Sequence, residues 1–410
     1  MKPLNRPPHA LKRDGGSMAI VGAGIAGLTL ATALGRAGIR CEVFEQAKNL
    51  REVGAGVQIA PNASRLLHRL GLAQRLGPVV VRPDAVEMRR WDDSRLLGRT
   101  ELGAACEELY GAPYYTVHRA DLHQSLLSGI DDNILHIGRR CVRVEELPEG
   151  ARLHFDDGST HDADVVIGAD GIHSVVRDAL AMDEPRFSGQ SIYRGLVPAD
   201  RLPFPLDEPK VRLWLGPRQH VVCYPVSGGK WVSVGATTPA GDWSTESWTA
   251  EGRVEDVVDA YQGWHKEATD VLNALDQVGR WALHDRDPLR HWCSAGGRIA
   301  VVGDAAHPML PFQAQGANQA IEDVIVLAAC LRVADQDGIP KALARYERTR
   351  RPRTDRLQQL SRSNSRRFHL SDGEGQRERD TALLGAQSLR EQEWLYGYDA
   401  EAVLLQDQLG

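Results

Sequence analysis

The hydrophobic positions near the start of the chain follow a strand–helix–strand pattern. Residues 18–21 form a continuous apolar run, and Leu28 and Leu34 then recur at helical spacing until Gly38 ends the pattern. A second apolar run follows at residues 41–44. Continuous apolar strands joined by a helix are typical of parallel sheets that are covered on both faces. The pattern therefore predicts a βαβ unit and an α/β fold.

A different pattern occupies residues 211–239, where polar and apolar positions alternate with period two. It predicts three consecutive strands, and Ser-Gly-Gly-Lys at residues 227–230 is a hairpin signal between the last two. The alternation puts His220, Val222 and Tyr224 on one face of the middle strand. We therefore expect an antiparallel sheet with these three side chains on the same side.

The composition excludes several classes of function. The 410 residues carry a net charge of -6 with a pI near 6.2, which gives no basic surface for nucleic acid. The six cysteines lack the spacing of a metal or redox site, so we expect no metal and a reduced, cytoplasmic setting. Residues 1–17 are typical of a disordered leader, and no apolar run is long enough to cross a membrane.

A glycine motif, Gly22-x-Gly24-x-x-Gly27, connects the first strand to its helix. Gly22 permits a tight turn, Gly24 lets the backbone approach a pyrophosphate, and Gly27 lets the helix pack closely on the strand. Glu45, at the end of the second strand, can accept both ribose hydroxyls of an adenosine. Glycines also serve ordinary turns, but the complete strand, turn, helix and acid pattern predicts a dinucleotide site.

Two more apolar strands end on a glycine-flanked aspartate. Residues 165–167 lead into Gly-Ala-Asp-Gly, which contains Asp170, and a helix that Ser174 is expected to cap. Residues 299–302 lead into Gly303 and Asp304. Such a turn can aim a carboxylate at ribityl or phosphate groups and free its amides for an anion. Together with the first motif, these turns favour FAD over NAD as the bound dinucleotide.

These three glycine-acid turns, in this order, resemble those of the single-component flavoprotein aromatic hydroxylases, the class of para-hydroxybenzoate, salicylate, 3-hydroxybenzoate and 6-hydroxynicotinate hydroxylases. The resemblance covers nearly all of the chain after the leader. It implies a Rossmann-type FAD-binding domain with an interleaved β-sheet substrate domain and C-terminal helices. The residues that it assigns to FAD are Gly22, Gly24, Ala26, Gly27, Glu45, Arg51, Gly56, Arg119, Asp170, Asp304, Gly316, Ala317 and Asn318.

The resemblance also places the flavin ring beside the segment that follows the last strand. Pro308 and Pro311 are expected to form a wall beside the ring, with Pro311 close to the position of the oxygen adduct. The helix that begins near Gly316 directs its positive end at the ring, where reduced flavin carries negative charge. His307 is expected to be a packed wall residue and not a catalyst.

Four residues are candidates for contact with the substrate: Gln58, His220, Tyr224 and Pro311. In the family resemblance, a histidine at the position of His220 could take the proton of a phenol, and Tyr224 could orient its oxygen. Each has a simpler alternative. Gln58 could bond the backbone in the core, His220 could lie on the surface, and Tyr224 could pack within the sheet.

The resemblance implies a monooxygenase that uses NADH or NADPH and O2 to hydroxylate a small phenolic or heteroaromatic acid through a flavin hydroperoxide. Salicylate-like and 3-hydroxybenzoate-like substrates are expected first. By the same resemblance, the 6-hydroxynicotinate hydroxylases have a histidine at the position of Gln58, which counts against 6-hydroxynicotinate as the substrate. The 3-hydroxybenzoate hydroxylases have a glutamine near the position of Pro311, which weakens the assignment of 3-hydroxybenzoate. Two alternatives stay open: a tailoring oxygenase for a larger aromatic or indolic product, and a flavin-binding redox module without turnover. The expected partners are the small substrate and O2, in a monomer or homodimer.

The predicted domains are interwoven along the chain. The FAD-binding domain takes residues 18–82, 110–186 and 290–340; the substrate domain takes 83–109 and 187–289; the C-terminal helical region takes 341–410.

Three local expectations complete the prediction. Asn62 is expected to cap a helix at residues 63–70. The arginine-rich segment at residues 345–370 is interpreted as a solvated helix face, with an anion or nucleic-acid site as the alternative. Residues 393–403, which are rich in aromatic side chains, are expected to pack on the core or at a subunit contact.

Overall fold

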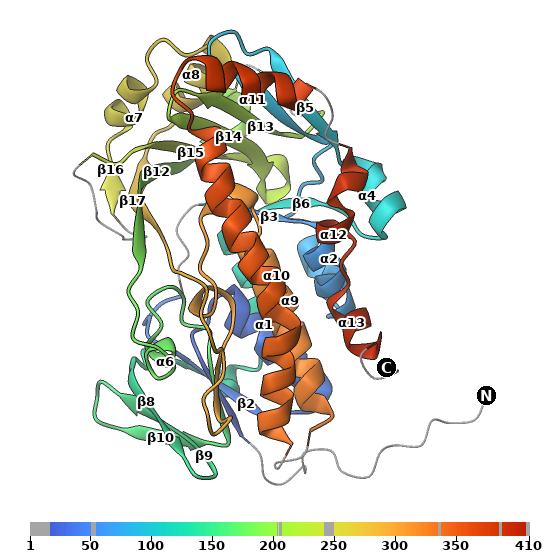
Figure 1. Ribbon diagram of the computed structural model, residues 1–410, viewed down its shortest axis with the longest axis vertical. Helices are drawn as coiled ribbons and strands as arrows, with labels where there is room; N and C mark the ends of the chain where they lie inside the picture. Colours follow the sequence, from blue (N-terminus) through green and yellow to red (C-terminus); the bar gives the residue numbers. More distant parts are fainter. Residues whose placement is uncertain are drawn as a thin grey trace.

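A computed structural model describes residues 17–50, 55–202, 204, 207–241, 250–334, 338–384 and 388–406. The predicted leader lies outside this description except for Ser17, and so does Arg51. Two large sheets lie at opposite ends of the molecule, and a long helix, α10 (Ile339–Phe368), extends between them (Figure 1).

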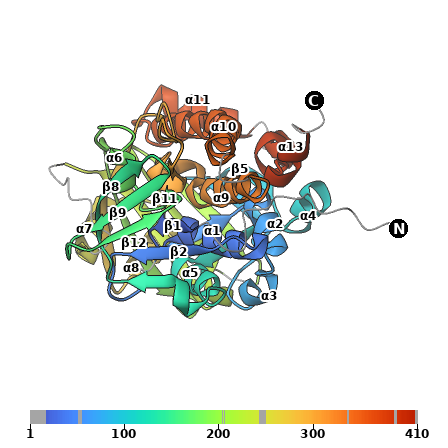
Figure 2. The ribbon, with the colours of Figure 1, turned by 90° about the horizontal axis from the view of Figure 1, so that it is seen from below.

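The first sheet has five parallel strands and contains all three predicted glycine-acid turns at its strand ends. Its strands, in spatial order, are β18 (Ile299–Val301), β11 (Val165–Gly168), β1 (Met18–Val21), β2 (Cys41–Glu45) and β7 (Leu135–Ile137). Helix α1 (Ile25–Ala37) joins β1 to β2 and ends at Gly38, in the left-handed conformation that favours glycine. The predicted βαβ unit is therefore confirmed, and Figure 2 shows α1 lying along the sheet.

The second sheet has eight strands and is mostly antiparallel. In spatial order they are β16 (Glu251–Gly252), β17 (Val278–Asp285), β12 (Arg186–Pro198), β15 (Trp231–Pro239), β14 (Gln219–Val226), β13 (Lys210–Gly216), β4 (Ala85–Arg90) and β5 (Leu96–Glu101). The three strands expected at residues 211–239 are β13, β14 and β15, so this prediction is confirmed. The strands come from residues 85–101 and 186–285, but the exact domain boundaries stay a prediction.

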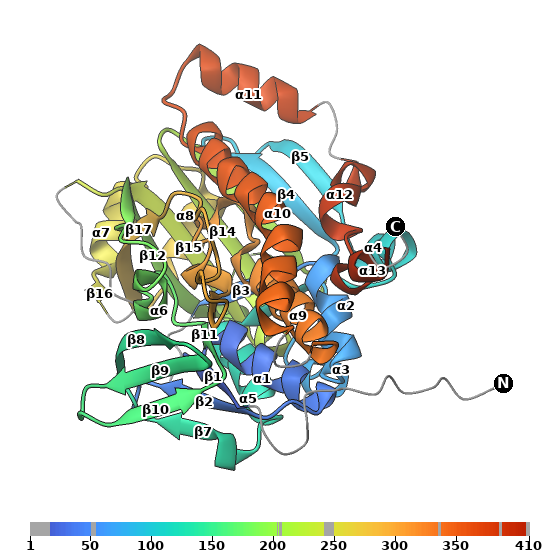
Figure 3. The same ribbon diagram turned by 60° about the horizontal axis from the view of Figure 1, so that its bottom comes forward.

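Smaller elements connect and cover the two sheets. The remaining strands are β3 (Gly56–Ile59), paired with β6 (Tyr115–His118), and the three-stranded sheet of β8 (Cys141–Leu147), β9 (Gly150–Phe155) and β10 (Thr160–Ala163). The remaining helices are α2 (Pro61–Arg69), α3 (Ala73–Leu76), α4 (Gly103–Tyr110), α5 (Arg119–Leu127), α6 (Val175–Asp178), α7 (Val254–Ala260), α8 (Lys266–Asn273), α9 (Gly316–Arg332), α11 (Glu374–Leu384), α12 (Glu393–Tyr396) and α13 (Ala400–Gln406). Figure 3 shows α11 beyond the end of α10, beside the edge strand β5.

The arginine-rich segment forms α10, and its interpretation as a solvated face is wrong at Arg350. This side chain is fully buried and pairs with two buried carboxylates of α9: its Nε lies 2.8 Å from Asp323, and an NH group contacts Glu322. The Nε of Arg353 lies 2.8 Å from Glu322. Buried charges are tolerated when they are paired in this way. The periodicity alone could not show this, because the partners lie on another helix.

The expectation that Asn62 caps a helix is also wrong. Helix α2 already begins at Pro61, and Ala60 occupies the capping position without a side-chain hydrogen bond. The side chain of Asn62 is buried and donates to Gln315 and Glu322 instead. Proline is favoured at the first helical position because its fixed φ suits the helix, which explains the earlier start.

The aromatic segment near the C-terminus packs on the core, as one of the two predicted alternatives states. Leu395 is buried, and the ring of Tyr396 lies 5.9 Å from that of Tyr114 and 6.0 Å from that of Tyr110. In the part of the chain that the structure describes, no helix is both long and apolar enough to cross a membrane.

Candidate functional site

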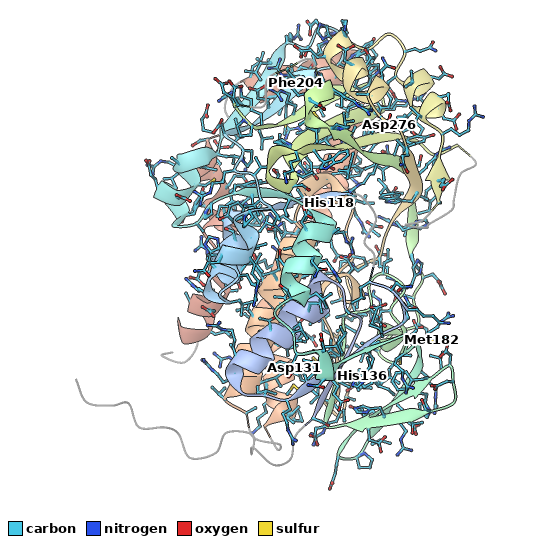
Figure 4. The ribbon with its side chains drawn as sticks, turned by 180° about the vertical axis from the view of Figure 1, so that it is seen from behind. His118, Asp131, His136, Met182, Phe204 and Asp276 are labelled. Atoms are coloured by element: carbon cyan, nitrogen blue, oxygen red, sulfur yellow. The ribbon has the colours of Figure 1, made fainter. Side chains whose placement is uncertain are left out.

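A single cavity of ≈ 330 Å³ extends from the glycine turn after β1 to the eight-stranded sheet. It lies where the two halves of the molecule meet, and Figure 4 labels His118 near this junction, directly before α5. The predicted FAD residues that line it are Gly24, Ala26, Gly56, Arg119, Asp304, Gly316 and Ala317. The predicted substrate residues that line it are Gln58, His220, Tyr224 and Pro311. The cavity thus brings together predicted residues that are up to 293 positions apart, from Gly24 to Ala317.

Each of the three glycines of the first motif has a different role in the structure. Gly22 has a φ of +102°, and a Cβ there would lie 2.5 Å from the carbonyl oxygen of Ala169. A Cβ on Gly27 would lie 1.9 Å from the carbonyl oxygen of Gly22, so only glycine lets α1 pack here. A Cβ on Gly24 would meet nothing within 4 Å. Gly24 is therefore not needed for packing, and its open side fits a ligand diphosphate at the N-terminus of α1.

Glu45 holds the glycine turn from the end of β2. Its two carboxylate oxygens accept hydrogen bonds from the backbone N–H groups of Ala23 and Ala47, each at 2.8 Å. Glu45 does not line the cavity as described, so its contact with a ribose stays a prediction.

Asp170 faces the start of α6 and does not line the cavity. Its carboxylate accepts from the hydroxyl of Ser174 at 2.5 Å and from the N–H of Val175 at 2.8 Å, while burial raises its pKa to about 6. Its neighbours Ala169 and Gly171 do line the cavity. Ser174 accepts from the N–H of Arg177, so the predicted cap is confirmed. Asp170 therefore holds the turn that lines the cavity through its hydrogen bonds to the start of α6. A direct contact of Asp170 with FAD stays a prediction.

Asp304 lines the cavity and lies on a turn that a hydrogen bond to Asp323 holds in place. Gly303, with a φ of +59°, donates its N–H to Asp323 at 3.0 Å. The surrounding protein raises the pKa of Asp304 above its ordinary value, although the side chain is exposed to the cavity itself. His307 is buried and lies 2.5 Å from Asp323, which confirms that it is a packed residue.

The N-terminus of α9 forms the next part of the wall. Gly316 and Ala317 line the cavity, whereas the side chain of Asn318 contacts the strand β3, which carries Gln58. Asn318 accepts from the N–H of Ala60 at 2.8 Å and donates to the carbonyl of Gln58 at 2.9 Å. It therefore fixes the position of β3 relative to α9. The side-chain oxygen of Gln58 accepts from the hydroxyl of Tyr114 at 2.7 Å.

The sheet contributes the opposite wall, and the predicted alternation along β14 is confirmed. His220, Val222 and Tyr224 all line the cavity. Gly56 makes room for the phenol, because a Cβ there would lie 2.4 Å from the ring of Tyr224. Burial raises the pKa of Tyr224, so its hydroxyl keeps its proton at neutral pH.

The sequence analysis missed Arg194 and Trp281, which also line this wall. The guanidinium carbon of Arg194 lies 5.7 Å from the centre of the Trp281 ring. Among the described residues, no carboxylate forms an ion pair with Arg194, and its Nε is buried without a hydrogen-bond partner. Burial lowers its pKa. A half-buried cation that lines a cavity in this way is suited to an anionic ligand.

Residues 17–361 match the model of a family described as "FAD binding domain". This chain belongs to that family. Its cofactor is FAD, and the cavity fits this group because Gly24 is open on the side of the ligand and Asp304 presents a carboxylate for a hydroxylated chain.

Several proteins that are named for the reactions of aromatic acids are similar over almost the full length. A 3-amino-4-hydroxybenzoate 2-monooxygenase of Streptomyces platensis is 48% identical over 386 residues, which are 94% of this chain and 97% of that protein. A 3-hydroxybenzoate 6-hydroxylase of Polaromonas naphthalenivorans is 35% identical over 95% of this chain and 97% of its own. A solved salicylate hydroxylase–substrate complex superposes with a TM-score of 0.80 at 29% identity, covering 95% of this chain and 97% of that one.

Proposed function

We propose that the protein is an FAD-dependent monooxygenase that hydroxylates an amino-hydroxybenzoic acid, with 3-amino-4-hydroxybenzoate as the first candidate. The observation that carries this proposal is the half-buried Arg194, whose Nε is buried without a hydrogen-bond partner, in the same cavity as His220 and Tyr224. A cation and two hydrogen-bonding groups on one wall suit a ring that carries a carboxylate and a hydroxyl. The similarity to 3-amino-4-hydroxybenzoate 2-monooxygenase supports the same substrate class.

FAD, once reduced by NADH or NADPH, supplies the electrons with which O2 is cleaved, so that one oxygen atom enters the ring and the other leaves as water. The residues of the chain position the acid for this reaction. We propose that Arg194 binds the carboxylate, and that His220 and Tyr224 bind the ring oxygen. Trp281, Ile192 and Leu283 form an apolar wall that excludes water from the reacting carbon.

The assay that tests this function measures NADH and NADPH oxidation by the purified holoenzyme with a panel of acids. We expect 3-amino-4-hydroxybenzoate to stimulate oxidation and to give a product with one added oxygen atom. Salicylate, 3-hydroxybenzoate and a larger indolic acid serve as comparisons. Stimulation only by the indolic scaffold would support a tailoring oxygenase, and no flavin reduction with any acid would support a redox module.

Substitution of Arg194 by glutamine is expected to raise KM for the acid about 10- to 100-fold, because a charge-assisted hydrogen bond contributes about 1.5–3 kcal/mol. The FAD content should be unchanged. The matching control is the primary amide of the same acid, whose KM should hardly differ between the parent and Arg194→Gln. An equal KM of both proteins for the acid would show that Arg194 does not bind the carboxylate.

We also propose that the protein works in the cytoplasm, where NADH and NADPH are supplied and its six free cysteines stay reduced. A monomer or homodimer remains the predicted assembly, and light scattering on the purified protein measures it.

A further inference from the structure

The half-buried side chain of Gln58 lines the cavity from β3. Its amide oxygen has two lone pairs, and its NH2 group has two protons. The hydroxyl of Tyr114 donates to Oε1 of Gln58 at 2.7 Å and takes one of these lone pairs. The second lone pair and the NH2 group remain for other partners, so that the protein holds one part of the amide and leaves the rest for a ligand.

The nearest functional neighbour of this amide is the hydroxyl of Tyr224. Gly56, two residues earlier on β3, contacts the ring of Tyr224 so closely that a Cβ there would lie 2.4 Å from it. Burial raises the pKa of Tyr224, and hydrogen bonds from Ser233 and Gln58 oppose this rise. Groups in hydrogen-bond contact are about 3 Å apart, which is close to the separation of two substituents on neighbouring ring carbons. A ring oxygen bound at Tyr224 therefore brings an adjacent ring position within reach of Gln58.

The other hydroxyl beside Tyr224 is already engaged. Oγ of Ser233 accepts the backbone N–H of Gly56 at 2.8 Å, and its own proton is donated to Tyr224. Val222 lines the same part of the wall with an apolar side chain. Gln58 therefore offers the acceptor that a ring substituent next to Tyr224 can use.

The C-terminal segment holds Tyr114 in place. Tyr114 is buried, and the ring of Tyr396 packs edge-on against it at 5.9 Å. Arg353 of α10 donates to the backbone carbonyl of Leu395 at 2.9 Å, and Arg65 of α2 donates to that of Tyr396 at 2.9 Å. Figure 1 shows α12 beside α2, the helix that follows β3. Packing thus fixes the hydroxyl of Tyr114, which in turn fixes one edge of the Gln58 amide.

We propose that Gln58 selects an amino group next to the ring hydroxyl of the substrate, and that Tyr114 is the positioning residue that holds its amide for this contact. This inference rests on the proposed function, because it takes the ring hydroxyl to bind at Tyr224. One N–H of the amino group donates to the second lone pair of Oε1. A methyl group at the same ring position would leave this lone pair unpaired in the closed site, which costs free energy.

Binding to the parent protein tests the selection without turnover. The oxidised holoenzyme is titrated, in the absence of NADH and NADPH, with 3-amino-4-hydroxybenzoate and with 4-hydroxy-3-methylbenzoate, and the flavin absorbance reports binding. The methyl group has nearly the size of the amino group but no N–H. We expect a Kd about tenfold lower for the amino acid. Equal Kd values, or tighter binding of the methyl acid, would overturn the proposal.

Gln58→Met removes the amide and keeps most of the side-chain volume. We expect the Kd of the amino acid to rise about tenfold and that of the methyl acid to change less than about twofold, with unchanged FAD content. Gln74→Met, at an exposed glutamine on α3, is the matched control and should keep the preference of the parent. A preference that persists in Gln58→Met would overturn the role of Gln58.

Tyr114→Phe tests the positioning role and also decides the question if Gln58→Met does not fold. It removes the hydroxyl and keeps the ring that packs on Tyr396. We expect the preference for the amino acid to fall about threefold, with unchanged Kd for the methyl acid. A purely structural role would weaken the binding of both acids, and an unchanged preference would contradict positioning by Tyr114.

The binding assay and the turnover assay separate this inference from the proposed function. If no acid is hydroxylated but the amino preference is found and is lost in Gln58→Met, the proposed function fails while the assignment of Gln58 stands. If 3-amino-4-hydroxybenzoate is hydroxylated but binds no better than the methyl acid, the proposed function stands while this inference is overturned.

Discussion

Replacement of Arg350 by methionine is expected to lower the free energy of unfolding by about 3–5 kcal/mol. The guanidinium is fully buried and pairs with Glu322 and Asp323, which are buried as well. It also donates to the side chain of Gln319 at 2.6 Å. Removal of the cation would take one positive partner from each of two buried carboxylates, and would leave Glu322 with Arg353 and Asp323 with His307. Methionine keeps most of the volume, so the loss would report on charge and not on a cavity.

Chemical denaturation of the parent and of Arg350→Met gives this difference directly. The matched control is Arg348→Met, because Arg348 lies on the same helix but is exposed. We expect its effect to stay within about 0.5 kcal/mol. A loss below about 1 kcal/mol for Arg350→Met would show that the buried carboxylates are not held as charged partners. FAD should also bind more weakly to Arg350→Met, because Asp323 braces the turn that carries Asp304.

Replacement of Gly24 by alanine is expected to weaken FAD binding at least about 100-fold, or about 2.7 kcal/mol. The protein itself has room for this methyl group, since a Cβ on Gly24 would meet nothing within 4 Å and its φ of -76° suits any residue. The methyl group would instead occupy the space in which we place the diphosphate. Titration of the apoprotein, followed by flavin fluorescence, measures the dissociation constant.

Gly35→Ala is the control for this experiment. Gly35 lies in the same helix, and a Cβ there would also meet nothing within 4 Å. We expect unchanged FAD binding and a stability gain of up to about 1 kcal/mol, because alanine is the better helix former. If Gly24→Ala and Gly35→Ala bound FAD equally well, the diphosphate would not lie over Gly24.

The sequence predicted the parts of the site that depend on local backbone geometry. Gly22, Gly27 and Gly303 stand where a side chain would clash or where φ is positive, so their motifs can be recognised without knowledge of the fold. The alternation along β14 likewise places His220 and Tyr224 on one face from the sequence alone.

The remaining parts depend on contacts between distant segments. Arg194 lies 26 positions before His220. His369, whose Nε2 lies 2.8 Å from Nδ1 of His220, lies 149 positions after it. No periodicity in the sequence connects either residue to His220. Arg350 was interpreted as solvated because arginines on a charged helix are usually exposed. Its partners are the two acids of α9, and only the packing of α10 on α9 brings these groups together.

The central claim is that FAD and the aromatic acid share the cavity between the two large sheets. A crystal structure with FAD and 3-amino-4-hydroxybenzoate tests it most directly. We predict the diphosphate over Gly24, the ribityl chain beside Asp304, the carboxylate of the acid at Arg194 and its ring oxygen at His220. An FAD molecule outside this cavity, or an acid bound away from the sheet wall, would contradict the account.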